Sequence, residues 1–390
     1  MPLNRTLRFG MVGGGPGAFI GAVHNRAATL DGLAVLVAGA FSSDPAKSRV
    51  QGEAYGLSPD RVYASYEEMA AAEAALPKGE RIDFVSIVTP NHLHFPVAKA
   101  FVERGFHVVC DKPMTTTLED AEELCRLVKK HDVVFALTHP YTAYPMVRQA
   151  RALVQDGTLG TIRKVVVEYS QGWLSTPLEQ TGQKQAGWRT DPALAGAGAI
   201  GDIGTHAEHL ARYVTGLEME RLLADVSSMV PGRRIDDDAN MLVHYEGGAK
   251  GILFCSQISV GEENRLSIRV YGTAASLEWH QEDPNFLYVR YPDGPTKVYK
   301  PGHAHLVAAA QRGTRTPAGH PEGMLEAFAN VYSNAIRVMT ARAAGETPDP
   351  ADLDFASVRD GAVGVHFIQA ALQSGREGGW VDASYTAPGA

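Results

Sequence analysis

Residues 7–18 read LRFGMVGGGPGA. An apolar run passes directly into a glycine turn, and a stretch with helical spacing follows. Read as G-x-G-x-x-A, the turn places Gly13, Gly15 and Ala18 at its key positions. In such a turn the first glycine permits the bend, the second lets the backbone approach a pyrophosphate, and the small third residue lets helix pack on strand. The segment therefore predicts a dinucleotide-binding turn, and a glycine turn that binds nothing is the alternative.

The first third of the chain repeats this alternation of short apolar runs and helical spacing. We expect strands at 7–12, 33–38, 84–88, 107–110 and 133–137, and helices at 18–29, 45–55, 66–75, 93–104 and 118–130. Repeated strand–helix–strand units form a parallel sheet covered on both faces, and right-handed crossovers make it doubly wound. The pattern predicts an α/β fold that begins with a doubly wound Rossmann domain over residues 1–140.

The pattern changes near residue 140 to longer segments of polar–apolar alternation. Strands are expected at 162–170, 222–229, 239–245, 251–258, 266–271 and 276–279, and helices at 143–155, 203–214 and 355–374. Connections such as Glu246-Gly247-Gly248 favour tight turns between antiparallel strands. The sequence predicts a second, α+β domain over residues 141–390 with a mostly antiparallel sheet.

Composition excludes several classes of function. The chain has 36 Lys and Arg against 44 Asp and Glu, a net charge of −8, and no basic run, which argues against nucleic-acid binding. The three cysteines are too few and too far apart for a disulfide framework or zinc motif. No segment reaches the ~18–20 apolar residues of a membrane helix, and the amino terminus lacks the apolar core of a secretory signal. We expect a cytoplasmic protein that binds no membrane.

A metal site is not expected either. His92 and His94 are followed by no third ligand at metal-binding spacing. The acidic run at 236–238 lacks the pattern of a calcium loop and is typical of a turn before a strand.

The end of the second strand bears on the choice between NAD and NADP. NAD enzymes usually place an acid here for the ribose hydroxyls, and Ser42 takes that position in this chain. Ser43, Lys47 and Arg49 lie close by, and hydroxyls with nearby cations suit a ribose 2′-phosphate. This favours NADP. In the alternative, Lys47 and Arg49 form a solvated helix face and Asp44 serves NAD. Asp44 can also simply cap the next helix, with Pro45 in its first turn.

Three further segments carry chemistry-bearing residues. They are TPNHLH at 89–94, CDKP at 110–113 and GAIGDIGTH at 198–206. With the glycine turn, and in this order, they resemble the Gfo/Idh/MocA family of glucose–fructose oxidoreductase, inositol dehydrogenase and their relatives. The resemblance extends over nearly the whole chain and includes Trp188-Arg189 and the segment that ends at Trp279. It implies a nicotinamide held between a Rossmann domain and an open-faced sheet, and homodimers or homotetramers that pair these sheets.

The position of Lys112 supports a catalytic role. It follows an expected parallel strand, at the edge where doubly wound sheets bind ligands, and Pro113 fixes the backbone after it. An oxidised nicotinamide and partial burial both favour the neutral amine, which can relay a hydroxyl proton. The family has Glu-Lys-Pro here, so Asp111 is a shorter acid in this chain. A surface lysine without a catalytic role is the alternative.

Asp202 and His206 form the second candidate pair. Residues four apart share one face of a helix, and histidine titrates near neutral pH. By resemblance, His206 is the general acid or base, and Asp202 binds substrate or supports the histidine. Asp202 as a helix N-cap is the alternative.

The resemblance adds further candidates. The loop with Asn91 and His94 would contact the nicotinamide end of the cofactor, and Thr89, Asp111 and Lys112 are further candidates for binding the cofactor. The candidate substrate contacts are Tyr141, Trp188, Arg189, Asp202, His206 and His320. For three of these an ordinary structural role stays open: Trp188 as core, Arg189 paired with Asp191, and His320 as part of the turn before a helix that begins near Glu322.

The sequence therefore predicts hydride transfer between NAD(P) and a secondary alcohol or ketone of a sugar, glycoside or cyclitol, without a metal. Two alternatives remain open. One is a glycosidase of the same fold that retains its NAD, and the other is a dinucleotide-binding regulator without enzymatic activity.

Overall fold

The computed structural model describes residues 5–389, which form two compact units. The first comprises residues 5–140, 328–362 and 387–389, and the second comprises residues 141–327 and 363–386. Two long helices, α11 (Met324–Ala344) and α12 (Val358–Glu377), are each divided between the units. The functional division expected from the sequence, 1–140 and 141–390, stays a prediction.

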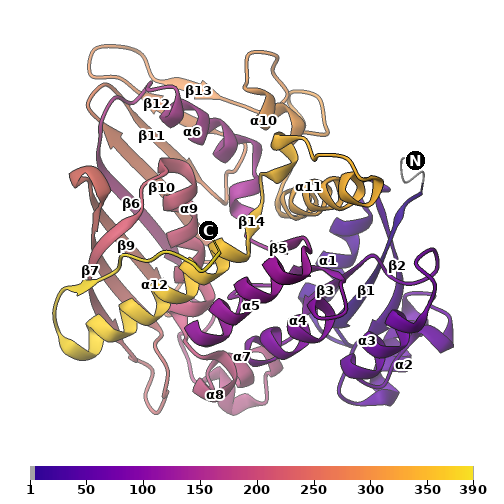
Figure 1. Cartoon of the computed structure of the whole chain (residues 1–390). Helices are drawn as coiled ribbons and strands as arrows, with labels where there is room; N and C mark the ends of the chain where they lie inside the picture. The colour runs from indigo at the N-terminus through magenta and orange to yellow at the C-terminus, as the bar shows by residue number, and fades with distance from the viewer. Residues whose placement is uncertain (1–4, 390) are drawn as a thin grey trace. The chain divides into compact units, whose positions relative to one another are not determined.

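The first unit contains a six-stranded sheet in the order β14-β5-β4-β3-β1-β2. Its strands are β1 (Leu7–Gly13), β2 (Ala34–Ala40), β3 (Phe84–Val88), β4 (His107–Cys110), β5 (Phe135–Leu137) and β14 (Ala356–Ser357). All neighbours pair in parallel except β14, which runs antiparallel to β5 although the two are far apart in the sequence (Figure 1). Because β3 is buried along its whole length, this sheet has the continuous apolar strands of a sheet covered on both faces.

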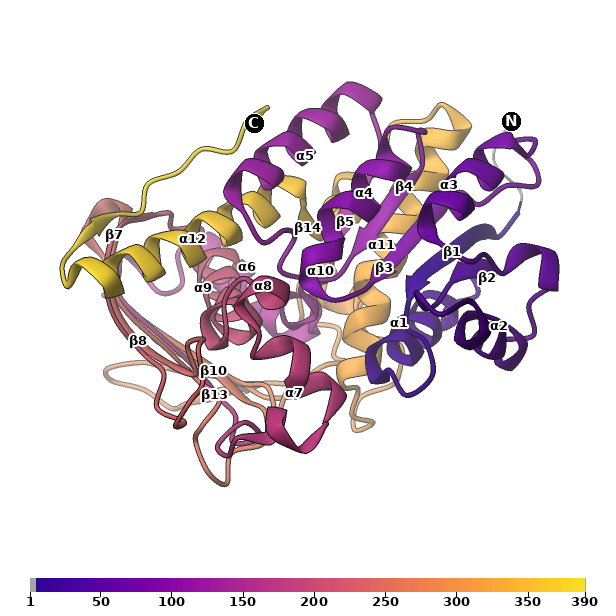
Figure 2. The same cartoon turned by 90° about the horizontal axis from the view of Figure 1, so that it is seen from below.

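Helices cover both faces of this sheet. They are α1 (Phe19–Thr29), α2 (Pro45–Ala54), α3 (Tyr66–Ala75), α4 (His94–Val102) and α5 (Leu118–His131). In Figure 2, α3, α4 and α5 lie in a row on the near face, and α11 lies behind the strands. Successive strands are added to one side of β1 as β2 and to its other side as β3, β4 and β5, so the strand order changes direction between β1 and β3. Doubly wound sheets bind their ligands at the carboxyl ends of the strands at such a point. The doubly wound Rossmann fold expected from the sequence is confirmed.

The second unit contains a nine-stranded sheet in the order β13-β12-β11-β10-β6-β9-β8-β7-β15. Its strands are β6 (Ile162–Ser170), β7 (Met219–Ser227), β8 (Asp238–Tyr245), β9 (Lys250–Ser256), β10 (Arg265–Gly272), β11 (Ser276–His280), β12 (Leu287–Arg290), β13 (Lys297–Tyr299) and β15 (Val381–Asp382). Only β6 and β9 pair in parallel, so the sheet is mostly antiparallel, as expected.

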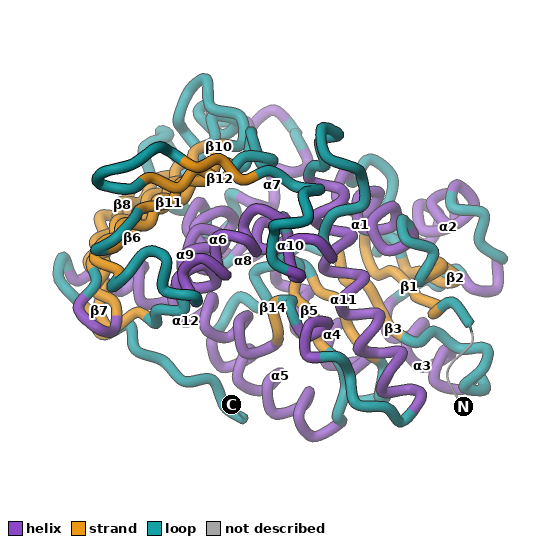
Figure 3. The backbone as a smooth tube through the Cα atoms, turned by 90° about the horizontal axis from the view of Figure 1, so that it is seen from above, coloured by secondary structure: helices purple, strands orange, loops and turns teal. Residues whose placement is uncertain are grey.

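One face of the second sheet is packed and the other is open. The unit's helices are α6 (Pro145–Gln155), α7 (Lys184–Arg189), α8 (Pro192–Ala195), α9 (Thr205–Thr215) and α10 (Ala308–Arg312). Figure 3 shows α6 and α9 against one face of the sheet. Along β8, Met241 and Val243 are buried while Asn240 and Leu242 are exposed, which is the alternation of a half-buried strand.

Two helices begin differently from the sequence-based expectation. The helix expected at 203–214 is α9, preceded by a single π-helical turn, Ile200–Gly204. The last helix begins at Val358, because Ala356 and Ser357 pair with β5 as β14.

Within residues 5–389, no helix carries an apolar stretch long enough to cross a membrane, α11 and α12 included.

Candidate active site

The glycine turn of the first unit has the shape of a dinucleotide cradle. Gly13 has φ +89°, and a Cβ there would lie 2.6 Å from the Val88 carbonyl oxygen. A Cβ on Gly15 would lie 2.7 Å from the Phe41 carbonyl oxygen. The first N–H groups of α1 receive no side-chain cap from Ala18, so they can donate to phosphate oxygens. The residues present fit a bound pyrophosphate.

Close packing of the helix on the turn involves a residue that the sequence motif does not include. A Cβ on Gly21 of α1 would lie 2.6 Å from the Gly14 Cα. Ala18 is the residue that precedes the helix and is half-buried. The glycine at 21 is therefore the one that allows α1 to approach the turn.

The segment after β2 shows how the residues expected near the ribose are engaged. The Ser42 hydroxyl accepts the Asp44 N–H at 3.1 Å, and Ser43 is exposed. The Asp44 carboxylate caps α2 by accepting the N–H of Ala46 at 2.9 Å. It also lies 3.9 Å from the Lys47 ammonium; Lys47 is exposed and Asp44 is about half-buried. The capping alternative for Asp44 is thus what the structure shows, and Lys47 lies beside a negative charge.

The loop after β3 is tied to the loop after β4 by one histidine. His94 is 1% exposed, with Nδ1 2.7 Å from the Pro113 carbonyl oxygen and Nε2 2.9 Å from the Thr89 carbonyl oxygen. A neutral imidazole has a single N–H, so it donates to one of these carbonyls at a time. Burial lowers the pKa of His94, which favours that neutral ring. Asn91, in the same loop, is also buried.

Asp111 and Lys112 follow β4 at the carboxyl edge of the sheet. Asp111 Oδ1 accepts the Lys112 N–H at 3.0 Å and the Thr138 hydroxyl at 2.8 Å. Lys112 is half-buried, and the peptide bond to Pro113 is cis. The first unit thus brings Gly13, Thr89 and Lys112 to one edge, at the ends of β1, β3 and β4.

In the second unit, His206 is enclosed by aromatic rings. It is buried in the first turn of α9, and its ring centroid lies 4.7 Å from that of Tyr141 in an edge-on arrangement. The Tyr141 hydroxyl lies 2.6 Å from the Tyr169 hydroxyl, which donates to Asn264 Oδ1 at 2.7 Å. Burial raises the pKa of Tyr169 well above its ordinary value, so this phenol stays protonated. The group combines a titratable imidazole with neutral hydrogen-bonding partners.

Asp202 lies in the π-helical turn before α9 and holds two polar partners. Its Oδ2 accepts from the Gln257 side-chain amide at 2.8 Å and lies 3.4 Å from Arg189 Nε. The residues that cap the π-helical turn and α9 are Ala199 and Gly204, so the N-cap alternative for Asp202 is wrong. π-Helical turns occur frequently at functional sites, because they displace a side chain from the regular helical register.

Arg189 does not pair with Asp191, the alternative that the sequence left open. Asp191 caps α8 and lies 3.7 Å from Arg234. The Arg189 guanidinium instead stacks on the Trp188 ring, 4.2 Å from its centroid, besides its contact with Asp202. Trp188 is half-buried rather than core. His320 is exposed, and its Nδ1 lies 3.2 Å from the Pro317 carbonyl oxygen of its own turn.

Sequence reasoning missed three members of the second-unit group: Tyr169, Gln257 and Asn264. Tyr169 lies one residue before the end of β6, and Gln257 comes directly after β9. Because β6 and β9 are parallel neighbours, their carboxyl ends meet at one edge of the sheet. Polar residues at the ends of both strands were therefore a usable signal, whereas nothing local in the sequence marks Asn264.

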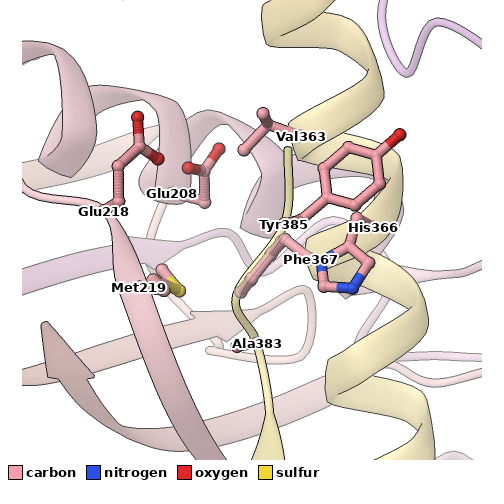
Figure 4. Close-up of a pocket in the computed structure, with 8 residues that line it drawn as sticks. All are labelled: Glu208, Glu218, Met219, Val363, His366, Phe367, Ala383 and Tyr385. Atoms are coloured by element: carbon pink, nitrogen blue, oxygen red, sulfur yellow. The ribbon is translucent and has the colours of Figure 1, made fainter. Parts of the chain in front are cut away.

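A separate cavity lies within the second unit (Figure 4). It encloses about 300 Å³, counted out to its mouth, and is lined by Glu208, Glu218, Met219, Val363, His366, Phe367, Ala383 and Tyr385. Glu208 is buried and accepts from Arg212 Nε at 2.8 Å, while the His366 and Tyr385 rings stack with centroids 4.6 Å apart. None of the lining residues is a predicted site residue, so this cavity has no part in the candidate active site.

Among residues 5–389, no three His, Cys, Asp or Glu side chains are grouped so as to hold a metal ion. Lys112 belongs to the first unit, whereas Asp202 and His206 belong to the second.

Comparison with known proteins identifies relatives of both units of this chain. Residues 7–139 match the oxidoreductase family with an NAD-binding Rossmann fold, and residues 147–278 match the GFO/IDH/MocA C-terminal domain. The uncharacterized oxidoreductase YfiI of Bacillus subtilis is 32% identical over 97% of this chain and 98% of its own length.

Two crystal structures are also similar over nearly the whole chain. An oxidoreductase from Sinorhizobium meliloti is 45% identical, with a TM-score of 0.88 over 97% of this chain and 99% of that one. An inositol dehydrogenase homolog from Azotobacter vinelandii, in complex with NADH and myo-inositol, is 36% identical, with a TM-score of 0.89 over 97% of this chain and 98% of that one. This chain belongs to the Gfo/Idh/MocA family of NAD(P)-binding oxidoreductases.

Proposed function

We propose that this protein is a dehydrogenase that transfers a hydride between a nicotinamide dinucleotide and a secondary alcohol of a cyclitol or sugar. The observation that carries the proposal is the polar group built around Asp202 and His206. It offers a carboxylate, an imidazole and a guanidinium within one unit, which suits a small neutral molecule with several hydroxyls. The related protein that binds NADH and myo-inositol supports a cyclitol as substrate.

The proposed roles follow from the chemistry of each side chain. His206 and Lys112 accept and release the proton of the reacting hydroxyl, since both can exist as neutral bases. Asp202 and Arg189 orient the neighbouring hydroxyls by accepting and donating hydrogen bonds. Tyr141 is a further substrate contact. Bound dinucleotide supplies the hydride acceptor, and the chain supplies orientation and proton transfer.

We propose NAD as the dinucleotide. The Lys47 cation lies next to the Asp44 carboxylate, so its attraction for a 2′-phosphate is reduced, and the cyclitol-binding relative holds NADH. NADP, which Ser42, Ser43 and Lys47 favour in the sequence, is the alternative. Titration of the purified protein with NADH and NADPH, followed by nicotinamide fluorescence, decides between them by their dissociation constants.

The proposed assembly is a homo-oligomer that pairs the open faces of the second-unit sheets. Exposed apolar side chains on that sheet, Leu242, Ile252 and Tyr271 among them, support this surface. Sedimentation of wild type and Leu242→Asp tests the assembly, and an unchanged sedimentation coefficient would rule out this surface.

We also propose a reducing, cytoplasmic location, because Cys110, Cys125 and Cys255 are buried and form no disulfide.

The test of the function is reduction of NAD in the presence of myo-inositol, related cyclitols, free sugars and glycosides, followed by absorbance. We expect turnover with a cyclitol or sugar and loss of that turnover in His206→Asn. Cleavage of a glycoside without net formation of NADH would instead show a glycosidase. Dinucleotide binding without turnover of any compound would favour a regulator.

A further inference from the structure

The turn that carries Asp202 in the second unit receives no cap from its own segment. The π-helical turn Ile200–Gly204 is preceded by Ala199, whose side chain makes no capping hydrogen bond. The first N–H groups of a helical turn have no partner within the turn, and buried N–H groups need an acceptor. Because Gly198, Ala199 and Ile200 are all buried, another part of the chain has to supply the acceptors.

A single residue, Asp236, accepts all three of these N–H groups. Its carboxylate oxygens accept the Gly198 N–H at 2.7 Å and the Ile200 N–H at 2.8 Å. Its backbone carbonyl oxygen accepts the Ala199 N–H at 3.0 Å. This close approach requires glycine at 198, because a Cβ there would overlap the Asp236 carbonyl oxygen. Asp236 therefore caps the turn from a segment that is distant in the sequence.

The adjoining part of the sheet holds the Asp202 side chain. Asp236 and Asp237 come just before β8, and Gln257 comes just after β9, the antiparallel neighbour of β8. The Gln257 N–H donates to the Asp237 carbonyl oxygen at 2.8 Å, which extends the pairing of the two strands. The buried side-chain amide of Gln257 donates to Asp202 Oδ2, also at 2.8 Å. One corner of the sheet thus holds both the backbone and the carboxylate of the Asp202 turn.

We propose that Asp236 and Gln257 are positioning residues for Asp202. Asp236 fixes the backbone of the turn, in which the Asp202 N–H donates to the Gly198 carbonyl oxygen at 2.8 Å. Gln257 fixes the direction of the carboxylate. The carboxylate is then oriented before a substrate hydroxyl binds, which lowers the entropic cost of reaching the reactive geometry. This deepens the proposed function and rests on Asp202 orienting the substrate there.

The chemistry of Asp236 suits a fixed acceptor. Burial raises the pKa of Asp236, and the N–H groups of Ile200 and Gly198 oppose that rise because they stabilise the charged form. An asparagine at position 236 has nearly the same size, but it replaces one of the two acceptor oxygens with an NH2 donor. One buried N–H group of the turn would then face another donor.

The test is a double-mutant cycle with Asp202. Asp236→Asn removes one acceptor of the turn. Gln257→Met keeps the length of the side chain but removes the donor to Asp202, and it serves if Asp236→Asn does not fold. Each substitution is measured alone and combined with Asp202→Asn. The cycle separates an effect that passes through Asp202 from a general loss of stability, because only the first depends on the residue at 202.

Asp237→Asn is the matched control. Asp237 is the next residue and is also buried, but its carboxylate accepts the N–H groups of Met229 at 2.8 Å and Val230 at 3.1 Å. A readout that requires no turnover is hydrogen–deuterium exchange of residues 198–204, followed by mass spectrometry. We expect exchange of this segment to be faster in Asp236→Asn than in wild type or Asp237→Asn.

With substrate, kcat/KM should fall about 10-fold in Asp236→Asn and in Gln257→Met, because the carboxylate is less well oriented. The dissociation constant of the dinucleotide should change little, since the glycine turn is untouched. In the Asp202→Asn background, either substitution should change kcat/KM less than about 2-fold. Asp237→Asn should lose stability and keep nearly wild-type kinetics.

The proposal is overturned if each substitution lowers kcat/KM by the same factor in the wild-type and Asp202→Asn backgrounds, or if Asp237→Asn loses as much as Asp236→Asn. Unchanged exchange of residues 198–204 in a folded Asp236→Asn protein would also overturn it. Faster exchange in Asp236→Asn, together with a wild type that turns over no polyol, would support the hold on the turn and contradict the proposed function.

Discussion

Individual side chains of the candidate site owe their properties to what surrounds them. Lys112 follows β4, and its backbone N–H and the Thr138 hydroxyl both donate to Asp111 Oδ1. Asp202 is held by an amide and a guanidinium, which keeps its oxygens in place for a polyol. His206 lies among rings that exclude water from most of its surface. Each of these settings can be tested by a single substitution.

Replacing Lys112 with methionine should lower kcat about 100-fold or more, because the proton of the reacting hydroxyl loses an acceptor. The dissociation constant of the dinucleotide should change little, since the glycine turn is untouched. Steady-state kinetics and fluorescence titration measure the two effects. Lys99→Met is the control, because Lys99 of α4 forms a partly exposed ion pair with Glu103, directly after that helix. Equal kcat in both variants would remove Lys112 from the reaction.

Replacing Asp202 with asparagine should lower kcat/KM about 100-fold, because the carboxylate that holds Arg189 and orients substrate loses its charge. Asp191→Asn is the matched control, since Asp191 caps the short helix α8 nearby. The expected pattern is a large loss in the first variant and nearly wild-type kinetics in the second. Similar kinetics for the two variants would show that Asp202 has only a structural role.

At the scale of elements, β1 and α1 are joined by the glycine turn, and the π-helical turn before α9 carries Asp202. The glycine turn could be recognised in the sequence because its requirement is local: the backbone must bend where no Cβ fits. The expected β1, β3 and β4 agree with the structure to within one residue, since these buried apolar runs have clear ends. The π-helical turn could not be predicted, because packing rather than local sequence decides where a helix takes an extra residue.

Contacts between elements that are far apart in the sequence could not be predicted either. Tyr332 reaches His24 only because α11 packs on the same face of the sheet as α1. β14 is two residues long and exists only through its pairing with β5. Helical periodicity and strand alternation describe one element at a time, so contacts between distant elements are outside their reach.

Substituting Gly15 with alanine should weaken dinucleotide binding at least about 10-fold, because the added Cβ would lie 2.7 Å from a backbone oxygen and occupy the path of the pyrophosphate. Gly79→Ala is the control, since a Cβ there meets no atom within 4 Å. Fluorescence titration with NADH measures both, and thermal unfolding shows whether each variant is folded. Unchanged binding by a folded Gly15→Ala protein would contradict the assigned cradle.

At the scale of the whole molecule, buried histidines link stability to pH. Burial lowers the pKa of both His24 and His107 to about 4, against about 6.5 in the unfolded chain. Below pH 6.5 the unfolded chain therefore binds more protons than the folded protein, and stability falls as the pH decreases towards 4. Burial lowers the pKa of His94 as well, so it acts in the same direction.

Between pH 7 and pH 5, His24 and His107 should each remove about 2 kcal/mol from the free energy of unfolding. Urea unfolding at the two pH values measures the loss. His107→Gln should lose less than wild type between them, because glutamine keeps an acceptor for the Val134 N–H but does not titrate. An equal loss in wild type and variant would show that His107 is not the group that titrates.

At this scale, a dehydrogenase must move a hydride from a polyol carbon to the dinucleotide. The most direct measurement uses myo-inositol deuterated at its ring carbons, incubated with NAD and the protein, and determines the mass of the recovered reduced dinucleotide. We predict one deuterium in the NADH formed by the wild type, and formation of reduced dinucleotide at least about 100-fold slower with Lys112→Met. If neither this cyclitol nor deuterated sugars transfer deuterium to NAD or NADP, the dehydrogenase assignment is wrong.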